Sequence, residues 1–447
     1  MKSYLYVALL AAAGLSAVSS QAASSIAASV KRSQIAGIDV MANRTAVKDV
    51  VVIFGSLPAG EVFNPPGQPV TAMLVAKMLD KGTAKQDKFA LARKLEDVGA
   101  SISFVAGNYM TSFQASCLKE NLPLVLSLLA EQLRLPAFSA EEFEKLKPQV
   151  TGGLQQSLDD PASRAGESFG QMVYPQGHPN KTATVQEQIE GVKTAKLADL
   201  RAFHAAHYGP AHMTMVIAGD FDLNSVRAVL QKNFSGWHGG TALPTAPTSA
   251  AGFVKVSQEQ TVFMPGKTSV IMLLGQATGL EYRDPDALAL RVGTTILGSG
   301  FTGRLMKNVR DKEGLTYSIG AGLSSDTFSD GEWKINATFA PALLGKGVAS
   351  TRRQLTEWYQ NGITTAELEQ RKTELVGSYY VSLATTNGLA QALLMAVQRG
   401  YDLTWLDEYP KAIQALTVEQ VNSAIKKHLD PNKMLLIEAG TIGEAKS

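Results

Sequence analysis

The chain has 447 residues, of which 45% are hydrophobic and 18% are charged, and its formal net charge at neutral pH is +2. A chain of this length can bury large cores and is expected to form two or more domains. The small net charge and the lack of lysine and arginine blocks argue against a nucleic-acid-binding protein, because binding to phosphates requires clustered positive charge.

The first residues have the features of a secretory signal peptide. Lys2 precedes an apolar stretch from Tyr4 to Val18, and small residues around Ala22 provide a cleavage site. We therefore predict that residues 1–22 are a signal peptide. The apolar run is too short for a membrane span, which needs about 20 residues. The mature protein is predicted to be periplasmic and to make no contact with a membrane after the signal is removed.

The first half of the mature chain contains patterns of both strands and helices. Apolar runs predict strands at 50–53 and 213–218, and apolar spacing predicts helices at 70–79, 89–98 and 122–133. Alternating residues at 102–117, with Gly-Asn at the bend, predict a hairpin. Cys117 is the single cysteine and lies in this hairpin, so we expect a buried apolar residue and no internal disulfide.

Three histidines, His204, His207 and His212, lie close together in the sequence. A His-x-x-His spacing on a helix could place two imidazoles near each other, but no acidic residue accompanies them. We therefore predict structural roles for these histidines, and also for His178 and His238, in place of a zinc site.

Two segments of the first half recur in the second half. LPAFSAEEFEKLKPQV at 135–150 is echoed by NGITTAELEQRKTELV at 361–376. The segment 189–220, a helix followed by a proline and an apolar strand, is echoed by 413–440. This repetition predicts two diverged copies of one α/β unit.

The repeats define a domain organisation. Residues 235–258 are rich in Gly, Pro, Ser and Thr and are predicted to form a linker. The linker separates an N-terminal domain at 35–234 from a C-terminal domain at 259–447. Each domain is predicted to be a two-layer α/β (α+β) unit in which helices pack on a largely antiparallel sheet.

Two segments resemble the signature regions of the pitrilysin-type zinc peptidases, the M16 family. They are MLDKGT at 78–83 and LGSGFTGRLMKNVRDKEGLTYSIGA at 297–321. The resemblance covers nearly the whole mature chain and includes the turn at 208–210. The chain length is similar to that of the family branch whose members have two homologous domains and work as pairs of subunits that close like a clam shell. The resemblance therefore implies an M16-like fold and a homologous partner.

The same resemblance implies that this chain has no zinc site. Active members carry His-x-x-Glu-His on the first long helix, where the two histidines bind zinc and the glutamate activates water. The histidine positions fall on Met73 and Lys77, the glutamate falls on Ala76, and a third ligand falls on Gly153. None of these residues can supply the chemistry. We predict that the chain binds no metal or other cofactor and does not hydrolyse peptides by itself.

Two residues of the second half match groups that act in the family. Arg310 and Tyr317 correspond to the arginine and tyrosine that paired members contribute opposite the zinc site, where they stabilise the substrate oxyanion. The resemblance implies a heterodimeric zinc peptidase in which this chain acts on peptides in trans, and zinc is expected in a partner subunit carrying His-x-x-Glu-His. From the residues themselves, Arg310 could instead pair with Asp311 or Glu313, and Tyr317 could pack within a strand.

The glycine-rich turn at Gly298 and Gly300 has two interpretations. It could contact substrate, as a glycine-rich segment does in the non-catalytic subunit of the related processing peptidase, or it could be an ordinary structural turn. A second functional hypothesis is that the chain is a non-catalytic scaffold in which Arg310 and Tyr317 serve packing only.

Overall fold

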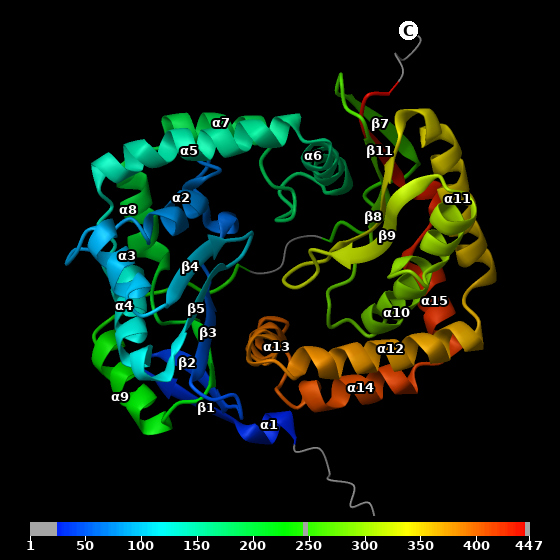
Figure 1. Ribbon diagram of the computed structural model, residues 1–447. Coiled ribbons are helices and arrows are strands. Elements are labelled where there is room, and N and C mark those ends of the chain that lie inside the picture. Colours follow the sequence, from blue (N-terminus) through cyan, green and yellow to red (C-terminus); the bar gives the residue numbers. More distant parts are fainter. Residues whose placement is uncertain (1–24, 245–248, 443–447) are drawn as a thin grey trace, which may run out of the picture.

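The computed structural model describes residues 25–244 and 249–442, so the predicted signal peptide at 1–22 lies outside the described residues. The chain forms two α/β units, each built around one sheet (Figure 1). The strands of the first unit are β1 (Val30–Ile35), β2 (Ile38–Arg44), β3 (Val50–Leu57), β4 (Ser101–Ala106), β5 (Thr111–Leu118) and β6 (Thr214–Gly219). The strands of the second unit are β7 (Gln258–Phe263), β8 (Val270–Ala277), β9 (Thr316–Ser324), β10 (Glu332–Phe339) and β11 (Leu435–Gly440).

Helices surround both sheets. Those of the first unit are α1 (Ile26–Ser29), α2 (Thr71–Met78), α3 (Lys88–Glu96), α4 (Leu122–Arg134), α5 (Ala140–Asp159), α6 (Pro161–Val173), α7 (Val185–Thr194), α8 (Leu197–His207) and α9 (Leu223–Phe234). Those of the second are α10 (Ala287–Gly298), the π-helical turn η3 (Met306–Lys312), α11 (Leu344–Asn361), α12 (Thr365–Leu383), α13 (Thr386–Gln398), α14 (Trp405–Ala415) and α15 (Val418–His428). The predicted helices are confirmed as α2, α3 and α4, and the predicted hairpin as β4 and β5.

The two sheets share one topology, as expected for two copies of one unit. The first sheet has the order β1-β2-β6-β3-β5-β4 and the second has the order β7-β11-β8-β10-β9. Apart from the additional strand β1, each sheet starts with one parallel pair, β2 with β6 or β7 with β11. All other pairs are antiparallel. The predicted α/β fold with largely antiparallel sheets is therefore confirmed.

The echoed segments at 135–150 and 361–376 become the starts of two equivalent helices, α5 and α12. Ser139 caps α5 because its side-chain oxygen accepts a hydrogen bond from the N–H of Glu142. Thr364 caps α12 in the same way, and the Glu367 carboxylate accepts a hydrogen bond from the N–H of Thr364 to complete a capping box. The repeat in the sequence is thus a repeat of helix-start signals.

Each sheet is covered on one face by helices of its own unit and on the other face by a helix of the opposite unit. Successive side chains of strand β6 point to opposite faces of the sheet. Ile217 faces the core of the first unit, whereas Val216 packs with Leu393 of α13. Reciprocally, Phe169 of α6 packs with Ile437 of the second sheet. Helices α6 and α13 both lie between the two units (Figure 1). The prediction of two layers holds for each unit's own elements. Helices α6 and α13, each of which packs on the sheet of the opposite unit, add a third layer and are called the exchanged helices.

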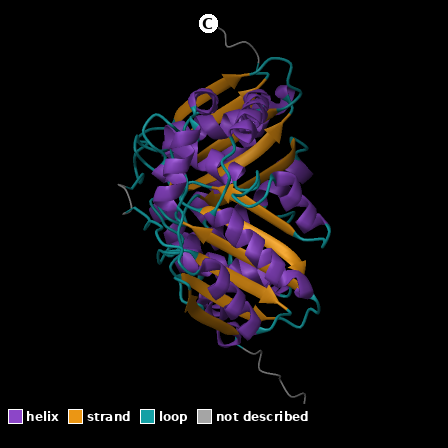
Figure 2. Ribbon diagram, turned by 90° about the vertical axis from the view of Figure 1, so that its left-hand side faces the viewer, coloured by secondary structure: helices purple, strands orange, loops and turns teal. Residues whose placement is uncertain are grey.

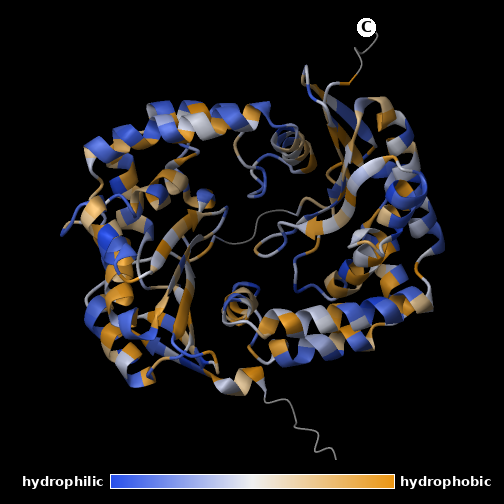
Figure 3. Cartoon of the chain, viewed as in Figure 1, coloured by the Kyte–Doolittle hydropathy of each residue, from blue (hydrophilic) through white to orange (hydrophobic). Residues whose placement is uncertain are grey.

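The layers of helices and strands extend through the whole molecule, and the outer helices are largely hydrophilic. Strands lie between helices from one end of the molecule to the other (Figure 2). The long helices α5, α7 and α12 show hydrophilic residues over much of their length, interrupted by apolar turns (Figure 3). Across the part of the chain that the structure describes, no single helix is long and apolar enough to cross a membrane, although the bent pair α12 and α13 passes that test by length and composition.

Candidate functional site

The four positions that the family resemblance assigns to a zinc site line one cavity. Met73, Ala76 and Lys77 of α2 and Gly153 of α5 border a cavity of about 470 Å³, which residues of the edge strand β4 also line. These positions are distant in the sequence, and the fold brings them to one cavity between α2, α5 and β4.

The side chains in this cavity do not fit a zinc ion. Alanine and glycine have no donor atom, and Met73 offers only a thioether, whereas zinc sites use His, Cys, Asp or Glu. The charged residues of the cavity are Lys77, Asp80 and Lys81, and Asp80 is paired with Lys81 at 3.1 Å. The Lys77 ammonium group therefore adds positive charge where a cation would bind. Over residues 25–244 and 249–442, no group of three or more His, Cys, Asp or Glu residues could hold a metal ion.

Arg310 lies in the π-helical turn η3, close to the edge strand β9. The N–H of Glu313 donates to the carbonyl of Asn308 at 3.0 Å, which is the wide spacing of a π-helix. The guanidinium carbon of Arg310 is 5.3 Å from the centroid of the Phe301 ring and 4.9 Å from that of the Tyr317 ring. Cation–π attraction therefore holds the arginine against two aromatic rings. Such π-helical turns are frequent at functional sites.

Tyr317 is the additional residue of a β-bulge in β9. Ser318 pairs with Thr338 and Thr316 pairs with Phe339, so Tyr317 is left without a partner on β10. The Thr316 hydroxyl stabilises this irregularity, because it donates to the carbonyl of Thr338 at 2.5 Å and accepts from the N–H of Ser318 at 3.2 Å. Bulges redirect side chains, and Tyr317 is 83% exposed. No pattern in the sequence predicted the bulge.

The surroundings of Arg310 and Tyr317 differ from two of the structural alternatives, a pair between Arg310 and Glu313 and packing of Tyr317 within the strand. The Glu313 carboxylate accepts hydrogen bonds from Arg353 at 2.7 Å and from Ser350 at 3.0 Å, and it is not paired with Arg310. Tyr317 is exposed and is not packed within the strand. A cationic donor and a phenolic donor therefore lie side by side at a sheet edge. We name Arg310, Tyr317 and Phe301 the edge cluster; the contact of Phe301 with the arginine was not foreseen.

The glycine-rich turn lies beside the edge cluster. A Cβ atom at Gly298 would lie 2.6 Å from the Cβ of Ala321, so glycine permits the close approach of α10 to β9. Gly300 has a φ of 63°, in the left-handed region that favours glycine, and a Cβ there would meet nothing within 4 Å. Packing thus accounts for the first glycine and backbone conformation for the second. Contact of either glycine with substrate stays a prediction.

The clustered histidines make structural contacts. A ring N–H of His204 donates to the carbonyl of Leu133 at 2.8 Å, and burial lowers the pKa of this histidine. The His207 ring lies 4.8 Å from that of Phe63 and 4.6 Å from that of Phe203, measured between centroids. Both contacts agree with the structural roles predicted for these residues.

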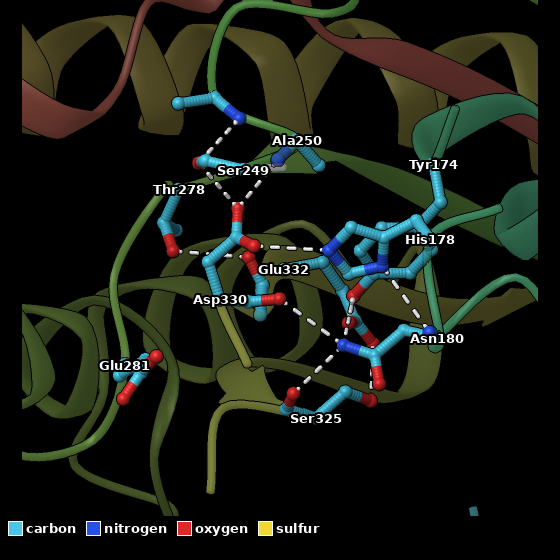
Figure 4. A network of polar contacts seen from close by, with 12 residues as sticks. Tyr174, His178, Asn180, Ser249, Ala250, Thr278, Glu281, Ser325, Asp330 and Glu332 are labelled. Atoms are coloured by element: carbon cyan, nitrogen blue, oxygen red, sulfur yellow. Dashed lines mark hydrogen bonds and ion pairs between the residues drawn. The ribbon is translucent and has the colours of Figure 1, made fainter. Parts of the chain in front are cut away.

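His178 has a larger structural role than its sequence context indicated. Its Nδ1 accepts a hydrogen bond from the N–H of Asn180 at 3.2 Å, so Nε2 carries the proton that is donated to Asp330 at 2.9 Å (Figure 4). Asp330 also accepts hydrogen bonds from the Ser249 hydroxyl and the N–H of Ala250, both at 2.8 Å. This network joins the segment after α6, the loop before β10 and the end of the linker. It is therefore a connection between the two units.

Comparisons with known proteins agree with the resemblance in the sequence. Residues 40–165 match the family model described as insulinase (peptidase family M16), and residues 194–375 match the model described as peptidase M16 inactive domain. The second match begins in the first unit and continues through the linker into the second. Together the two models cover well over half of the chain.

Similar proteins carry both peptidase and non-peptidase names. An uncharacterised zinc protease of Mycobacterium bovis is 26% identical over 365 residues, which cover 80% of this chain and 81% of the relative. The non-peptidase homolog YmxG of Helicobacter pylori is 24% identical over 372 residues, which cover 81% of this chain and 82% of that protein. The crystal structure of a peptidase M16 inactive domain from Pseudomonas fluorescens has a TM-score of 0.84 at 26% identity and matches 94% of this chain and 99% of that chain.

Proposed function

Because the chain belongs to the M16 peptidase family, we propose that it is the non-metal-binding subunit of a two-chain zinc peptidase. The observation that carries this proposal is the exposed pair of Arg310 and Tyr317 in a chain whose zinc-position cavity holds no zinc ligand. The match to an inactive-domain model and the similarity to a non-peptidase homolog support a chain without a complete catalytic site of its own.

In this proposal, Arg310 and Tyr317 donate hydrogen bonds to the carbonyl oxygen of a peptide bound at the zinc site of a homologous subunit. Negative charge develops on that oxygen when water adds to the carbonyl carbon, and fixed donors aimed at it lower the barrier. The partner, carrying His-x-x-Glu-His, supplies the metal and the base. The Glu313 carboxylate, one of the two carboxylates near Arg310 in the sequence, is bonded to Arg353 instead.

The outer edge of β9 supports peptides as the substrate class. Strand β9 is the last strand of the second sheet and pairs only with β10. An edge strand presents backbone N–H and C=O groups to which an extended chain can add. Tyr317 projects from this strand, so a peptide bound along it would pass the edge cluster. We therefore propose unfolded peptides as substrates and, from residues 1–22, a periplasmic location.

The test uses the mature chain isolated from its native host together with any homologue that accompanies it. We expect peptide hydrolysis only when this chain and a zinc-bearing companion are both present. Arg310→Ala and Tyr317→Phe should each lower kcat by about 10²–10³-fold while leaving the assembly intact. Arg352→Ala is the matched control, because Arg352 pairs with Glu259 of β7 at the opposite edge of the same sheet. Its turnover should equal that of the wild type.

Three results would change the assignment. Unchanged turnover of Arg310→Ala would remove this arginine from the mechanism. Isolation without any homologous companion would favour the scaffold hypothesis. Zinc-dependent hydrolysis by this chain in the absence of a companion would show that its catalytic site has been placed wrongly.

A further inference from the structure

A second cavity is formed by α12, α13, α14 and the loop after β8. It has a volume of about 260 Å³, and its lining includes the aromatic side chains of Tyr282, Tyr379, Tyr401, Trp405 and Tyr409. The rings of Tyr401 and Trp405 stack with their centroids 4.4 Å apart, and those of Tyr379 and Tyr409 are 4.9 Å apart. This aromatic cavity shares no lining residue with the zinc-position cavity or the edge cluster.

Arg399 is the charged residue that lines the aromatic cavity. It follows directly after α13, and its guanidinium carbon lies 3.4 Å from the centroid of the Tyr282 ring. Its Nε is buried and has no hydrogen-bond partner among the residues that the structure describes. Within the described ranges, no carboxylate is paired with this guanidinium. The contact with the tyrosine ring compensates only part of the hydration that a half-buried cation loses.

A neighbouring arginine does not relieve this excess of positive charge. Arg291 contacts the same Tyr282 ring, with its guanidinium carbon 4.1 Å from the centroid. The carboxylate of Asp326 forms an ion pair with Arg291, so that charge is already matched. On α14, the Asp407 carboxylate accepts hydrogen bonds from the backbone N–H groups of Ile26 and Ala27. Arg399 is therefore left as the uncompensated cation, although burial lowers its pKa.

We propose that the aromatic cavity binds an organic anion in which a carboxylate is joined to an apolar ring. The carboxylate would accept charge-assisted hydrogen bonds from Arg399, and the ring would pack against Tyr401 and Trp405. A largely apolar cavity with one charged group is the usual form of a small-molecule site. Cationic ligands do not fit, because the lining contains one cationic and no anionic side chain. A free aromatic acid and the C-terminal residue of a peptide both have this chemistry.

The experiment compares matched acids and amides on the mature chain by isothermal titration calorimetry. The probes are N-acetylphenylalanine, its amide, and a short peptide ending in phenylalanine with a free or an amidated C-terminus. We expect a carboxylate to bind about tenfold or more tightly than its amide, because only the carboxylate pairs with Arg399. Binding of the free acid and not the peptide would identify a small-molecule site, and the reverse would identify a site for peptide termini.

Arginine variants test which group selects the carboxylate. Arg399→Gln should remove the preference for acid over amide, whereas Arg399→Lys, which keeps the charge, should retain part of it. Arg283→Gln is the matched control, because Arg283 adjoins Tyr282, is 60% exposed and lies 4.0 Å from Glu281. It should keep the full preference. Arg310→Ala should also keep the preference for acid over amide, so this test of the aromatic cavity is independent of the proposed peptidase role.

Two outcomes would overturn the proposal. One is equal binding of acid and amide to the wild type, and the other is an unchanged preference in Arg399→Gln. If Arg399→Gln does not fold, the thermal unfolding midpoint of the wild type with each ligand provides the test. The acid, and not the amide, is expected to raise the midpoint, since a ligand that binds only the folded state stabilises it.

Discussion

The zinc-position cavity and the edge cluster lie at comparable places in the two units, each beside the edge strand of its sheet. Residues of β4 line the cavity in the first unit, and β9 carries Tyr317 in the second. The first unit has a cavity bordered by the positions assigned to a zinc site, but these positions hold no side chains that bind zinc. The second unit exposes side chains able to donate hydrogen bonds through a π-helical turn and a bulge. Under the proposed function, only the second unit supplies groups to an active site.

The place of helix α2 in the first unit does not depend on the residues at the positions assigned to zinc. Helix α2 is held by Leu74, Val75 and Met78, which are fully buried. These residues belong to the core of the first unit and do not depend on what occupies Met73 or Lys77. The place of α2 is thus fixed by packing and not by the residues at the positions assigned to zinc.

The largest effect is expected from placing zinc ligands in the first unit, which would give its cavity the chemistry that it lacks. The combined variant Met73→His, Ala76→Glu, Lys77→His and Gly153→Glu should bind zinc in equimolar amount, because the four positions line one cavity. A Cβ at Gly153 would meet nothing within 4 Å, so a side chain can be accommodated. Zinc content after dialysis, determined by mass spectrometry, measures the effect.

The matched control for this variant leaves Gly153 unchanged. It lacks one ligand and should hold zinc more weakly than the full variant. A folded full variant that retains no zinc would show that the side chains at these positions cannot converge on one ion.

A second test concerns the exchanged helices, which make the stability of each unit depend on the other. Phe169→Ala in α6 should lower the free energy of unfolding by about 3–5 kcal/mol, and Leu393→Ala in α13 by about 2–5 kcal/mol, because both side chains are buried against the opposite sheet. Denaturant unfolding followed by tryptophan fluorescence should show one shifted transition. Phe89→Ala is the control, since Phe89 is 70% exposed. Separate transitions for the two units would contradict this coupling.

The smallest effect concerns how the stability that glutamate contributes in the capping boxes of α7 and α12 depends on pH. Although partial burial raises the pKa of Glu367, hydrogen bonds from Arg304 and Thr364 outweigh it and lower the pKa from 4.5 to about 2. The stability from this carboxylate is fully present above pH 4.5 and is lost as the pH falls towards about 2. Glu367→Gln should therefore lose less unfolding free energy than the wild type over this range, as followed by thermal denaturation.

The variant Glu187→Gln separates the effect of a capping box on the pH dependence from the effect of the ion pair between Arg304 and Glu367. Glu187 occupies the same position in the capping box of α7, where Thr184 is its hydrogen-bond partner. Arg304 contacts Glu367 through two hydrogen bonds of 2.7 Å. An equal change of the pH profile in both variants would mean that the capping box, and not Arg304, causes the effect.

Local patterns in the sequence determined the class of fold, the repeat, several elements and the identity of the residues at the zinc positions. Apolar spacing placed α2, α3 and α4, and the echoed segments marked equivalent helix starts at Ser139 and Thr364. These features depend on neighbouring residues, so they can be read from the chain. The choice of Met73, Lys77 and Gly153 came from the family resemblance, and the cavity that they share agrees with it.

Only the tertiary structure decided how distant segments meet. The exchange of α6 and α13 and the His178–Asp330 contact, between residues 152 positions apart, depend on the placement of one unit against the other. The surroundings of Arg399 depend on how α12, α13 and α14 pack within the second unit. The exposure of Tyr317 depends on a bulge opposite Thr338, which is a property of strand pairing. Sequence periodicity specifies which face of an element is apolar, but not which distant element will cover that face.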